Sequence, residues 1–307
     1  MSLAFSTSWN AFRHDKARDM LFEINKLGFS ELELSFNLTA SMVSEIAKLK
    51  EKNGFRVASV HNFCPIPESF ERKAALPDCY SISSFDKEER EQAVKYTKRT
   101  IDTASLLGAR AVVLHCGRVQ MEDQTRKLID LYERGLKDTE TFREIRQEFL
   151  RDRASTAGPF FDYALSSLEE LNKYAEEKGV YLGVENRFYY PEIPNLEELG
   201  RILGEFKSSR IFYWHDTGHA RVMENLGLAR HKEYLDLYGK SMIGAHIHNV
   251  TGCRDHQAPV SGELDFLELK PYLKKETLKV IEAHHPATAK DIKQSKELLE
   301  KIFDGII

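Results

Sequence analysis

The sequence predicts a single closed (β/α)8 barrel, and three observations lead to this prediction. Short β-rich runs recur along the 307 residues, with segments of helical periodicity between them. No Pro-, Ser- or Gly-rich linker interrupts the series, so residues 1–307 are expected to form one domain. Neither a G-x-G-x-x-G nor a G-x-x-x-x-G-K-S/T motif follows any run, which removes the main support for the rival architecture, an open doubly wound sheet.

Eight runs qualify as strands because each is short and rich in β-forming residues, with a helical pattern between one run and the next. They are residues 3–7, 31–36, 56–60, 111–114, 180–184, 211–214, 242–248 and 278–281. The helices between them are predicted from apolar residues three and four apart, and four of them stop at a glycine. They are residues 13–27, 39–52, 86–107, 160–177, 196–206, 226–237 and 290–303.

Two segments depart from the regular alternation. Residues 62–85 are Pro-rich and aperiodic, too long for an ordinary βα loop, and are expected to form a lid. Residues 118–157 are charged but carry helical periodicity in Leu128, Leu131 and Leu136, which predicts one or two extra helices over the mouth. If the apolar residues of this insertion are exposed, the expected assembly is a homodimer.

Composition narrows the class of protein and its partners. The formal net charge of -4 argues against a surface built to hold nucleic acid, so we expect a small-molecule substrate. No apolar run approaches the roughly 18 residues of a membrane helix, and the first residues lack the features of a signal peptide. We therefore expect no membrane partner and a cytoplasmic location. The four cysteines include no C-x-x-C pair and are expected to be reduced thiols.

Polar residues stand at or just past the ends of the predicted strands. In a barrel the carboxyl ends of the strands converge on one mouth, and active sites are built there. Asp216 and His219 are the clearest pair, because the run 211–214 delivers them into a turn that contains Gly218. A capping Asp beside an unrelated His would give the same spacing, so the argument rests on the whole set. Its members are Glu33, His61, His115, Glu185, Asp216, His219, His246 and Glu282.

These residue types indicate a divalent metal centre. Carboxylate oxygens and neutral imidazole nitrogens suit Zn, Mn, Co or Mg to differing degrees. Glu185 and Glu282 each follow a buried apolar strand, where an ionised carboxylate needs a cation or another partner. His246 and His248 lie two residues apart on one strand and therefore share a face. For any one histidine, a hydrogen-bonded core residue remains the alternative.

On its motifs the chain resembles the xylose isomerase-like TIM barrels. This superfamily holds sugar and sugar-phosphate isomerases and epimerases, endonuclease IV-like proteins and AP endonuclease family 2. The resemblance covers nearly the whole chain. Its specific parts are Val184-Glu185, Asp216-Thr217-Gly218-His219, Ala245-His246-Ile247-His248-Asn249, Asp255-His256 with Gly262, and Ile281-Glu282.

The resemblance implies a metal-binding core and a set of further ligands. The core would consist of Glu185, Asp216, His246 and Glu282, the ligands shared by the isomerases and epimerases. The further ligands, which in endonuclease IV-like members hold additional zinc ions, would be His61, His115, His219, Asp255 and His256. The implied cofactor is therefore one to three divalent ions, of Zn, Mn, Co or Mg.

Two departures from the family pattern bear on this assignment. The chain has Asn249 where the family often shows H-x-H-D, which is expected to alter only an outer hydrogen bond. Asp255 and His256 are adjacent, where endonuclease IV-like members have D-x-H. Adjacent residues on an extended segment do not face one ion as easily as residues two apart, which argues against a third metal site.

The first functional hypothesis is an isomerase or epimerase of a small sugar, sugar phosphate or related polyol. It would act by proton transfer through a metal-bound enediolate, with Glu185 and Glu282 as the base and acid on the two faces of the substrate. His219 would complete the catalytic set. Other side chains near strand ends are expected to bind the substrate: Arg187, His248, Trp9 and Arg254.

The second hypothesis is a zinc-dependent, endonuclease IV-like phosphoester hydrolase with a di- or trinuclear site. This chemistry would give His61, His115 and His256 a role. The net charge favours a small phosphodiester over DNA as its substrate. A binding barrel without catalysis is the third class, and it would leave the ligands unexplained. The arginines could instead pair with surface carboxylates, and the aromatic residues could instead belong to the core.

Overall fold

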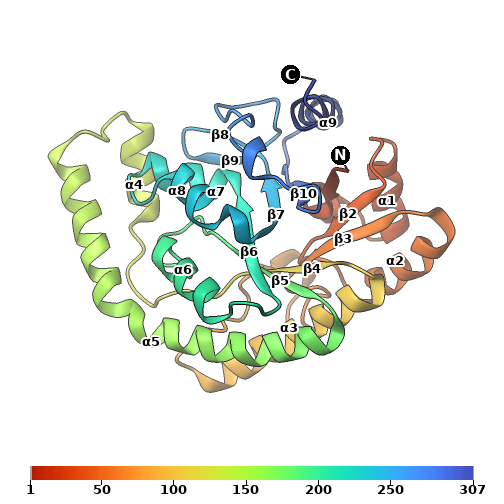
Figure 1. Cartoon of the computed structure of the whole chain (residues 1–307), viewed down its shortest axis with the longest axis horizontal. Helices are drawn as coiled ribbons and strands as arrows, with labels where there is room; N and C mark the ends of the chain where they lie inside the picture. The colour runs from red at the N-terminus through yellow and green to blue at the C-terminus, as the bar shows by residue number, and fades with distance from the viewer. Residues whose placement is uncertain (1, 307) are drawn as a thin grey trace.

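The structure, a computed structural model, describes residues 2–306 and contains a closed barrel of eight parallel strands (Figure 1). Around the barrel the order is β1-β10-β7-β6-β5-β4-β3-β2. Barrel strands that are consecutive in the sequence are therefore neighbours, and β10 closes the barrel against β1. The bounds are β1 Ala4–Ser6, β2 Glu31–Leu34, β3 Arg56–His61, β4 Ala111–Leu114, β5 Tyr181–Glu185, β6 Ile211–Asp216, β7 Met242–Ile247 and β10 Leu278–Ile281. The predicted (β/α)8 barrel is confirmed, and each predicted strand overlaps an observed one.

Inside the barrel, buried side chains form a cluster that contains Trp214. Trp214 lies there, fully buried, between β5 and β7. A Cβ atom added at Gly183 would come within 2.8 Å of the indole, and one added at Gly244 would overlap it. The two glycines therefore make room for one large ring. Beyond it toward the mouth lies His246, whose ring centroid is 5.1 Å from that of Trp214.

The helices form the outer layer (Figure 1). They are α1 Ala17–Asn25, α2 Ala40–Asn53, α3 Lys87–Leu107, α4 Thr125–Glu133, α5 Glu140–Lys178, α6 Leu196–Glu205, α7 Thr217–Asn225, α8 His231–Tyr238 and α9 Ala289–Phe303. One helix and one β-hairpin were not predicted. Helix α7 begins directly at the expected turn after Asp216, and a hairpin of β8 Asn249–Thr251 and β9 Arg254–Gln257 follows β7.

Helix α5 corrects the predicted boundary of the insertion. The sequence predicts separate helices on either side of Pro159, but one helix of 39 residues runs through it. Buried residues recur at helical spacing across the proline, at Arg153, Ala157, Phe160 and Ala164. This continuous burial outweighs the cost of a proline inside a helix, about 3 kcal/mol.

The insertion buries its own apolar residues. Leu128, Phe142 and Phe149 form a cluster with Val222 and Met223 of α7. Among the described residues, no large apolar side chain between 118 and 157 is classed as exposed. The exposed apolar surface on which the expected homodimer depended is therefore absent from this part of the chain.

The segment 62–85 contains only one short helical turn, Arg72–Ala74, and is tied to the mouth at two points. Nε of Arg72 donates to the carbonyl of Asn37, and Nη1 donates to that of His14. Asp78 reaches His115. The segment thus contacts residues that follow β1, β2 and β4, and its role as a lid stays a prediction. Within residues 2–306, no helix combines the length and the apolar character that a membrane span requires.

Candidate metal centre

Four residues from four neighbouring strands converge on one point above Trp214. The last inward-facing positions of β5, β6 and β7 are Glu185, Asp216 and His246, and Glu282 directly follows β10. Nδ1 of His246 lies 2.6 Å from Oε1 of Glu185, 2.9 Å from Oε2 of Glu282 and 3.7 Å from Oδ2 of Asp216. All four side chains are at most 8 % exposed. The four predicted core ligands are thus brought together.

Glu33 holds the far side of the same imidazole. Nε2 of His246 lies 3.0 and 3.1 Å from the two carboxylate oxygens of Glu33. Because a carboxylate only accepts, Nε2–H donates to Glu33, and Nδ1 is the nitrogen that faces the other carboxylates. The hydroxyl of Ser59 donates to Glu33 and fixes its rotation.

A second group shares Glu185 with the core. His61, His115 and Glu185 each offer a ligand atom within 4.8 Å of the others. Nδ1 of His61 lies 2.9 Å from the carbonyl oxygen of Asn62, and Nδ1 of His115 lies 2.9 Å from Oδ1 of Asp78. Each Nδ1–H therefore donates outward, and both Nε2 atoms face Glu185, at 3.9 and 2.8 Å from its Oε2.

A third group consists of His219, Asp255 and His256. Adjacent residues were expected to face one ion less easily than residues two apart, yet the ligand atoms of these three residues lie within 4.8 Å of one another. His256 lies within β9 and has a φ of 52°, in the left-handed region, where the pairing of β9 with β8 shifts register between Asn249 and Thr251. This conformation swings its ring to the side of Asp255, whose Oδ2 lies 2.9 Å from Nδ1 of His256 and 3.6 Å from Nε2 of His219.

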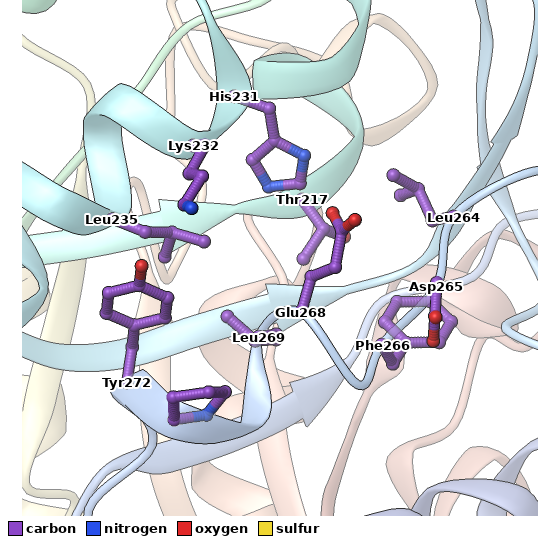
Figure 2. Close-up of a pocket in the computed structure, with 11 residues that line it drawn as sticks. Thr217, His231, Lys232, Leu235, Leu264, Asp265, Phe266, Glu268, Leu269 and Tyr272 are labelled. Atoms are coloured by element: carbon purple, nitrogen blue, oxygen red, sulfur yellow. The ribbon is translucent and has the colours of Figure 1, made fainter.

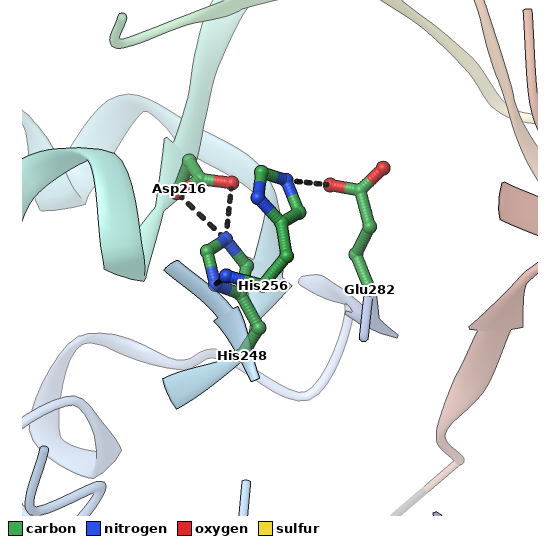
Figure 3. Close-up of side chains that lie close together, drawn as sticks. All are labelled: Asp216, His248, His256 and Glu282. Carbon is green, nitrogen blue, oxygen red and sulfur yellow. Dashed lines mark hydrogen bonds and ion pairs between the residues drawn. The ribbon is translucent and has the colours of Figure 1, made fainter. Parts of the chain in front are cut away.

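The imidazole of His248 is fully buried and is directed at the carboxylate of Asp216 (Figure 3). Its Nδ1 accepts from the backbone N–H of His256 at 2.8 Å, so Nε2 carries the proton and donates to both oxygens of Asp216, at 3.0 and 2.9 Å. Both nitrogens are engaged, which leaves none for a substrate. A Cβ at Gly218 would overlap the ring of His248, so this approach depends on the glycine of the Asp216–His219 motif.

Asp216 also begins α7. Its Oδ1 accepts from the backbone N–H of His219 at 2.7 Å, the geometry of an N-cap. The amide of Asn186 holds the strand end from the other side: its Nδ2 donates to the carbonyl of Asp216 and its Oδ1 accepts from the backbone N–H of Asp216. The ligand is thereby fixed through its own backbone.

The charges in the centre are those of a cation-binding site. Burial favours the neutral acid, but His246 and His115 outweigh it and hold the pKa of Glu185 well below its usual range. Burial likewise opposes the charge on His246, but Glu282, Glu33 and Glu185 raise its pKa well above the ordinary value. The proton on Nδ1 of His246 thus occupies the point where three carboxylates meet.

A divalent ion fits this donor set. Ligand atoms around a tetrahedral zinc ion at about 2.0–2.1 Å lie about 3.4 Å apart, and the three distances from His246 Nδ1 bracket that value. Replacing the Nδ1 proton by a metal ion would give the buried carboxylates a stronger counter-charge. His61, His115 and Glu185 form the next set, and His219, Asp255 and His256 the third.

The other residues predicted to bind substrate lie in differing places. Trp9 is buried, and its indole N–H donates to the carbonyl of Ala287, so it belongs to the core. Arg187 is buried and bridges Oε2 of Glu185, at 3.1 Å, and Oδ2 of Asp78, at 3.3 Å. Arg254 is exposed on β9.

Two half-buried rings lie beside ligands at the mouth. Phe36 lies 5.7 Å from His61 and Phe188 lies 5.8 Å from His219, measured between ring centroids. Trp214, by contrast, belongs to the barrel core. Asn249 replaces the aspartate that the family often carries. It holds the segment that follows β9, because its Nδ2 donates to the carbonyl of Pro259, which an aspartate could not do.

Sequence reasoning gave no role to three residues that shape the centre. Asp78 lies in an aperiodic segment, and no pattern marks it. Asn186 directly follows a predicted ligand but is an amide, which suggested no metal chemistry. Glu33 stands at a strand end and was recognised as polar there, yet its partner is 213 residues away in the sequence.

The comparisons with known proteins agree with the fold. No curated protein sequence matches the chain. A D-tagatose 3-epimerase-like protein superposes with a TM-score of 0.67 at 18 % identity, covering 100 % of this chain and 98 % of the other. An L-ribulose 3-epimerase superposes with a TM-score of 0.68 at 18 % identity, covering 99 % of this chain and 95 % of the other. A protein from Thermus thermophilus, in a structure soaked with ZnCl2, superposes with a TM-score of 0.62 at 19 % identity, covering 99 % of this chain and 98 % of the other.

A family model extends this agreement to the sequence itself. The model described as "Xylose isomerase-like TIM barrel" matches residues 21–302, which include every strand of the barrel except β1 and all the candidate ligands. The chain therefore belongs to the xylose isomerase-like TIM barrel family.

Proposed function

We propose that the protein is a divalent-metal-dependent isomerase or epimerase of a small sugar, sugar phosphate or related polyol. The observation that carries the proposal is the approach of Glu185 and Glu282, from strands on either side of β7 in the barrel, to Nδ1 of His246 at 2.6 and 2.9 Å. Two carboxylates across one cation position suit proton removal and return beside a carbonyl. Sugar epimerases among the structures with the same fold support the choice of substrate class.

A metal ion held by Glu185, Asp216, His246 and Glu282 would polarise the substrate carbonyl and stabilise negative charge on its oxygen. Glu282 is the better base of the two glutamates. Its Oε2 faces His246, whereas Oε1 has no hydrogen-bond or ion-pair partner in the described part of the chain. A free oxygen at the mouth can accept a proton from substrate carbon.

Glu185 is suited to the opposite role. Its Oε2 accepts from Nε2 of His115 at 2.8 Å. Burial and Arg187 oppose protonation of His115, but Asp78 and Glu185 outweigh them and raise its pKa to about 9. His115 can therefore pass a proton through Glu185 to the second face of the substrate. His219, with Nδ1 facing the carbonyl of Asn186 at 3.1 Å, presents Nε2 toward the mouth and can accept from a substrate hydroxyl.

The experiment is proton exchange on a panel of ketopentoses and ketohexoses in D2O, with Mn²⁺, Co²⁺ or Zn²⁺ added. Deuterium on the carbon beside the carbonyl, detected by NMR, is the expected result. Glu282→Gln should abolish it, with a loss of at least 10³-fold, while metal content is retained or reduced. Glu268→Gln, a matched surface glutamate, should leave the rate unchanged. No exchange with any sugar and metal would contradict the proposal.

A second candidate is favoured by one specific observation. The groups around His61 and around His219 are complete, and the first shares Glu185 with the core. A site with two or three ions would suit hydrolysis of a small phosphodiester. Two results together would decide for this candidate. The protein would release nitrophenolate from bis(4-nitrophenyl) phosphate in a reaction that depends on His115, and it would exchange no proton in the sugar assay.

A further inference from the structure

One charged side chain of the insertion is buried and contacts the segment between β5 and α6. Arg153 lies on α5 before Pro159 and is 2 % exposed, and its partner Glu198, in the first turn of α6, is 6 % exposed. Nη1 and Nη2 of Arg153 donate to the two carboxylate oxygens of Glu198, at 2.8 and 2.7 Å. A buried ion pair adds little net stability, because the loss of hydration opposes the attraction between the charges. What the guanidinium adds is a rigid fork of donors at fixed angles.

Two further N–H groups of this fork hold the backbone of residues 186–195. Nε of Arg153 donates to the carbonyl of Tyr190 at 2.7 Å, and Nη2 donates to that of Glu192 at 3.0 Å. Backbone hydrogen bonds with residues 116–119 hold the same segment from the side of β4. Loss of Arg153 should therefore let the two carbonyls turn without detaching the segment.

Glu192 links this anchor to the metal centre. Its Oε2 accepts from the backbone N–H of Tyr189 at 3.0 Å, and its Oε1 lies 3.4 Å from Nη2 of Arg187. Arg187 in turn contacts Oε2 of Glu185 at 3.1 Å and Oδ2 of Asp78 at 3.3 Å. The residue that Arg153 holds by its carbonyl thus holds, by its carboxylate, the arginine that contacts a core ligand.

The packing around Arg187 leaves its position to these contacts. A cavity of about 20 Å³ borders Arg187 together with Tyr190 and Glu192. Close packing fixes a side chain only where its neighbours fill the space around it. The ion pairs with Glu192, Glu185 and Asp78 therefore set where the guanidinium lies, and a shift of Glu192 should move it.

We propose that Arg153 is a positioning residue for Glu185. Through the carbonyls of Tyr190 and Glu192 it places Arg187, and Arg187 fixes the rotation of the Glu185 carboxylate against the metal position. The insertion then helps to shape the centre. The predicted effect on proton transfer rests on the proposed function, whereas the predicted effect on metal binding does not.

The test needs a variant that loses the fork but not the fold. Arg153→Met alone would leave the Glu198 carboxylate buried without a counter-charge, which is strongly destabilising. The variant of choice combines Arg153→Met with Glu198→Gln, which removes both charges and keeps an oxygen to accept from the backbone N–H of Asn195. Its Tm should stay close to that of the wild type.

Co²⁺ is the probe, because its visible absorption reports the geometry of its ligands. In the double variant, the affinity for Co²⁺, measured by competition with a fluorescent chelator, should fall about tenfold, as when an outer partner of a ligand is lost. The Co²⁺ spectrum should change with it. Wild-type affinity and spectrum in the folded double variant would overturn the proposal.

Arg153→Lys gives the same test by a second route. The lysine keeps a positive charge beside Glu198, but a single ammonium cannot reproduce the planar fork that bridges the carboxylate and two carbonyls. If only the charge matters, Co²⁺ affinity returns to the wild-type value, and the proposal is overturned. If the geometry matters, the affinity stays low.

Two controls change matched residues outside these contacts. Arg151→Met removes an exposed arginine of the same helix. Glu268→Gln changes an exposed glutamate that lines a cavity of about 250 Å³ between α8 and the segment after β9 (Figure 2), which none of Arg153, Glu192 and Arg187 borders. Both variants should keep the wild-type affinity and spectrum. A loss equal to that of the double variant in either would overturn the proposal.

Proton exchange on the sugar panel separates this inference from the proposed function. With Co²⁺ at saturation, the double variant should lower kcat about tenfold and leave KM unchanged, because the change reaches Glu185 and not the binding of substrate. A raised KM with unchanged kcat would overturn the positioning role. A wild-type protein that exchanges no sugar proton would refute the proposed function, and Co²⁺ affinity would still decide the role of Arg153.

Discussion

Both carboxylate oxygens of Glu33 lie within 3.1 Å of Nε2 of His246, on the opposite side of the ring from Glu185 and Glu282. The pair joins β2 and β7 across the barrel interior. It fixes the tautomer and the rotation of the only histidine in the core ligand group, and it does so without being exposed to the substrate.

The Glu33–His246 pair predicts an effect on metal affinity. Glu33→Gln keeps the shape but weakens the hold on Nε2–H and lowers the basicity of Nδ1, so affinity should fall about 10–100-fold. Competition with a fluorescent chelator measures it. Glu31→Gln, on the same strand but paired with Arg56 at the surface, is the control and should change nothing. An affinity equal to wild type in Glu33→Gln would refute the orienting role.

Gly218 predicts a steric effect on the same centre. In Gly218→Ala the new methyl group would overlap the ring of His248, which must withdraw from Asp216. We expect weaker metal binding and a loss of stability of a few kcal/mol, measured by denaturant unfolding with and without metal. Gly204→Ala is the control, since a Cβ there meets nothing within 4 Å and should stabilise the helix slightly. Equal behaviour of the two variants would contradict this packing.

The contact between Asp78 and His115 leads us to predict that metal binding at the second ligand group can be lost separately from binding at the core. Asp78→Asn removes the carboxylate that accepts from Nδ1 of His115, at 2.9 Å, and reaches the core only through Arg187, which contacts both Asp78 and Glu185. Elemental analysis should show one fewer ion per chain if the wild type holds more than one. Asp86→Asn, in which Asn can still cap α3, should keep the wild-type content. Loss of every ion from Asp78→Asn would contradict the separation of the groups.

The metal-free protein should lose stability as the pH rises. Burial opposes protonation of His256, but Asp255 outweighs it and raises the pKa to about 9, as for His115. Unfolded histidine titrates near about 6.5. A histidine whose pKa is raised in the folded state stabilises the folded protein fully below about pH 6.5. This contribution falls as the pH rises toward the folded-state pKa of about 9.

For the chelated protein we therefore expect the free energy of unfolding to fall between pH 6.5 and 9.5, by about 3 kcal/mol for each of the two histidines at most. Urea unfolding at several pH values measures this. The metal-loaded protein is the control, because an ion in place of the protons should remove the fall or reverse it. A chelated protein equally stable across this range would show that the two histidines are not protonated.

The regular part of the fold was open to prediction from local pattern. Most strands are short apolar runs. A polar residue at the last inward-facing position of such a run, as at Glu185 or Asp216, therefore stands out in the sequence. The positions of these ligands follow from the period of a strand and the geometry of a barrel.

The parts that were missed depend on distant contacts or on unusual backbone. Helix α5 passes Pro159 because of what packs against it, which local propensity does not report. The left-handed φ of His256 converts adjacent residues into neighbours in one ligand group. The partners of His246 and His115, Glu33 and Asp78, are joined to them only by the closing of the barrel and the folding of the lid segment.

The central claim is that the buried cluster around His246 holds divalent metal, and the metal content of protein purified without chelator tests it most directly. Elemental mass spectrometry should find at least one ion per chain, lost in Glu185→Gln. Retention of that ion in His115→Ala would favour the isomerase, and loss of one of two or three zinc ions there would favour the hydrolase. Protein with no bound metal, and none taken up on addition of Zn²⁺, Mn²⁺ or Co²⁺, would contradict the account.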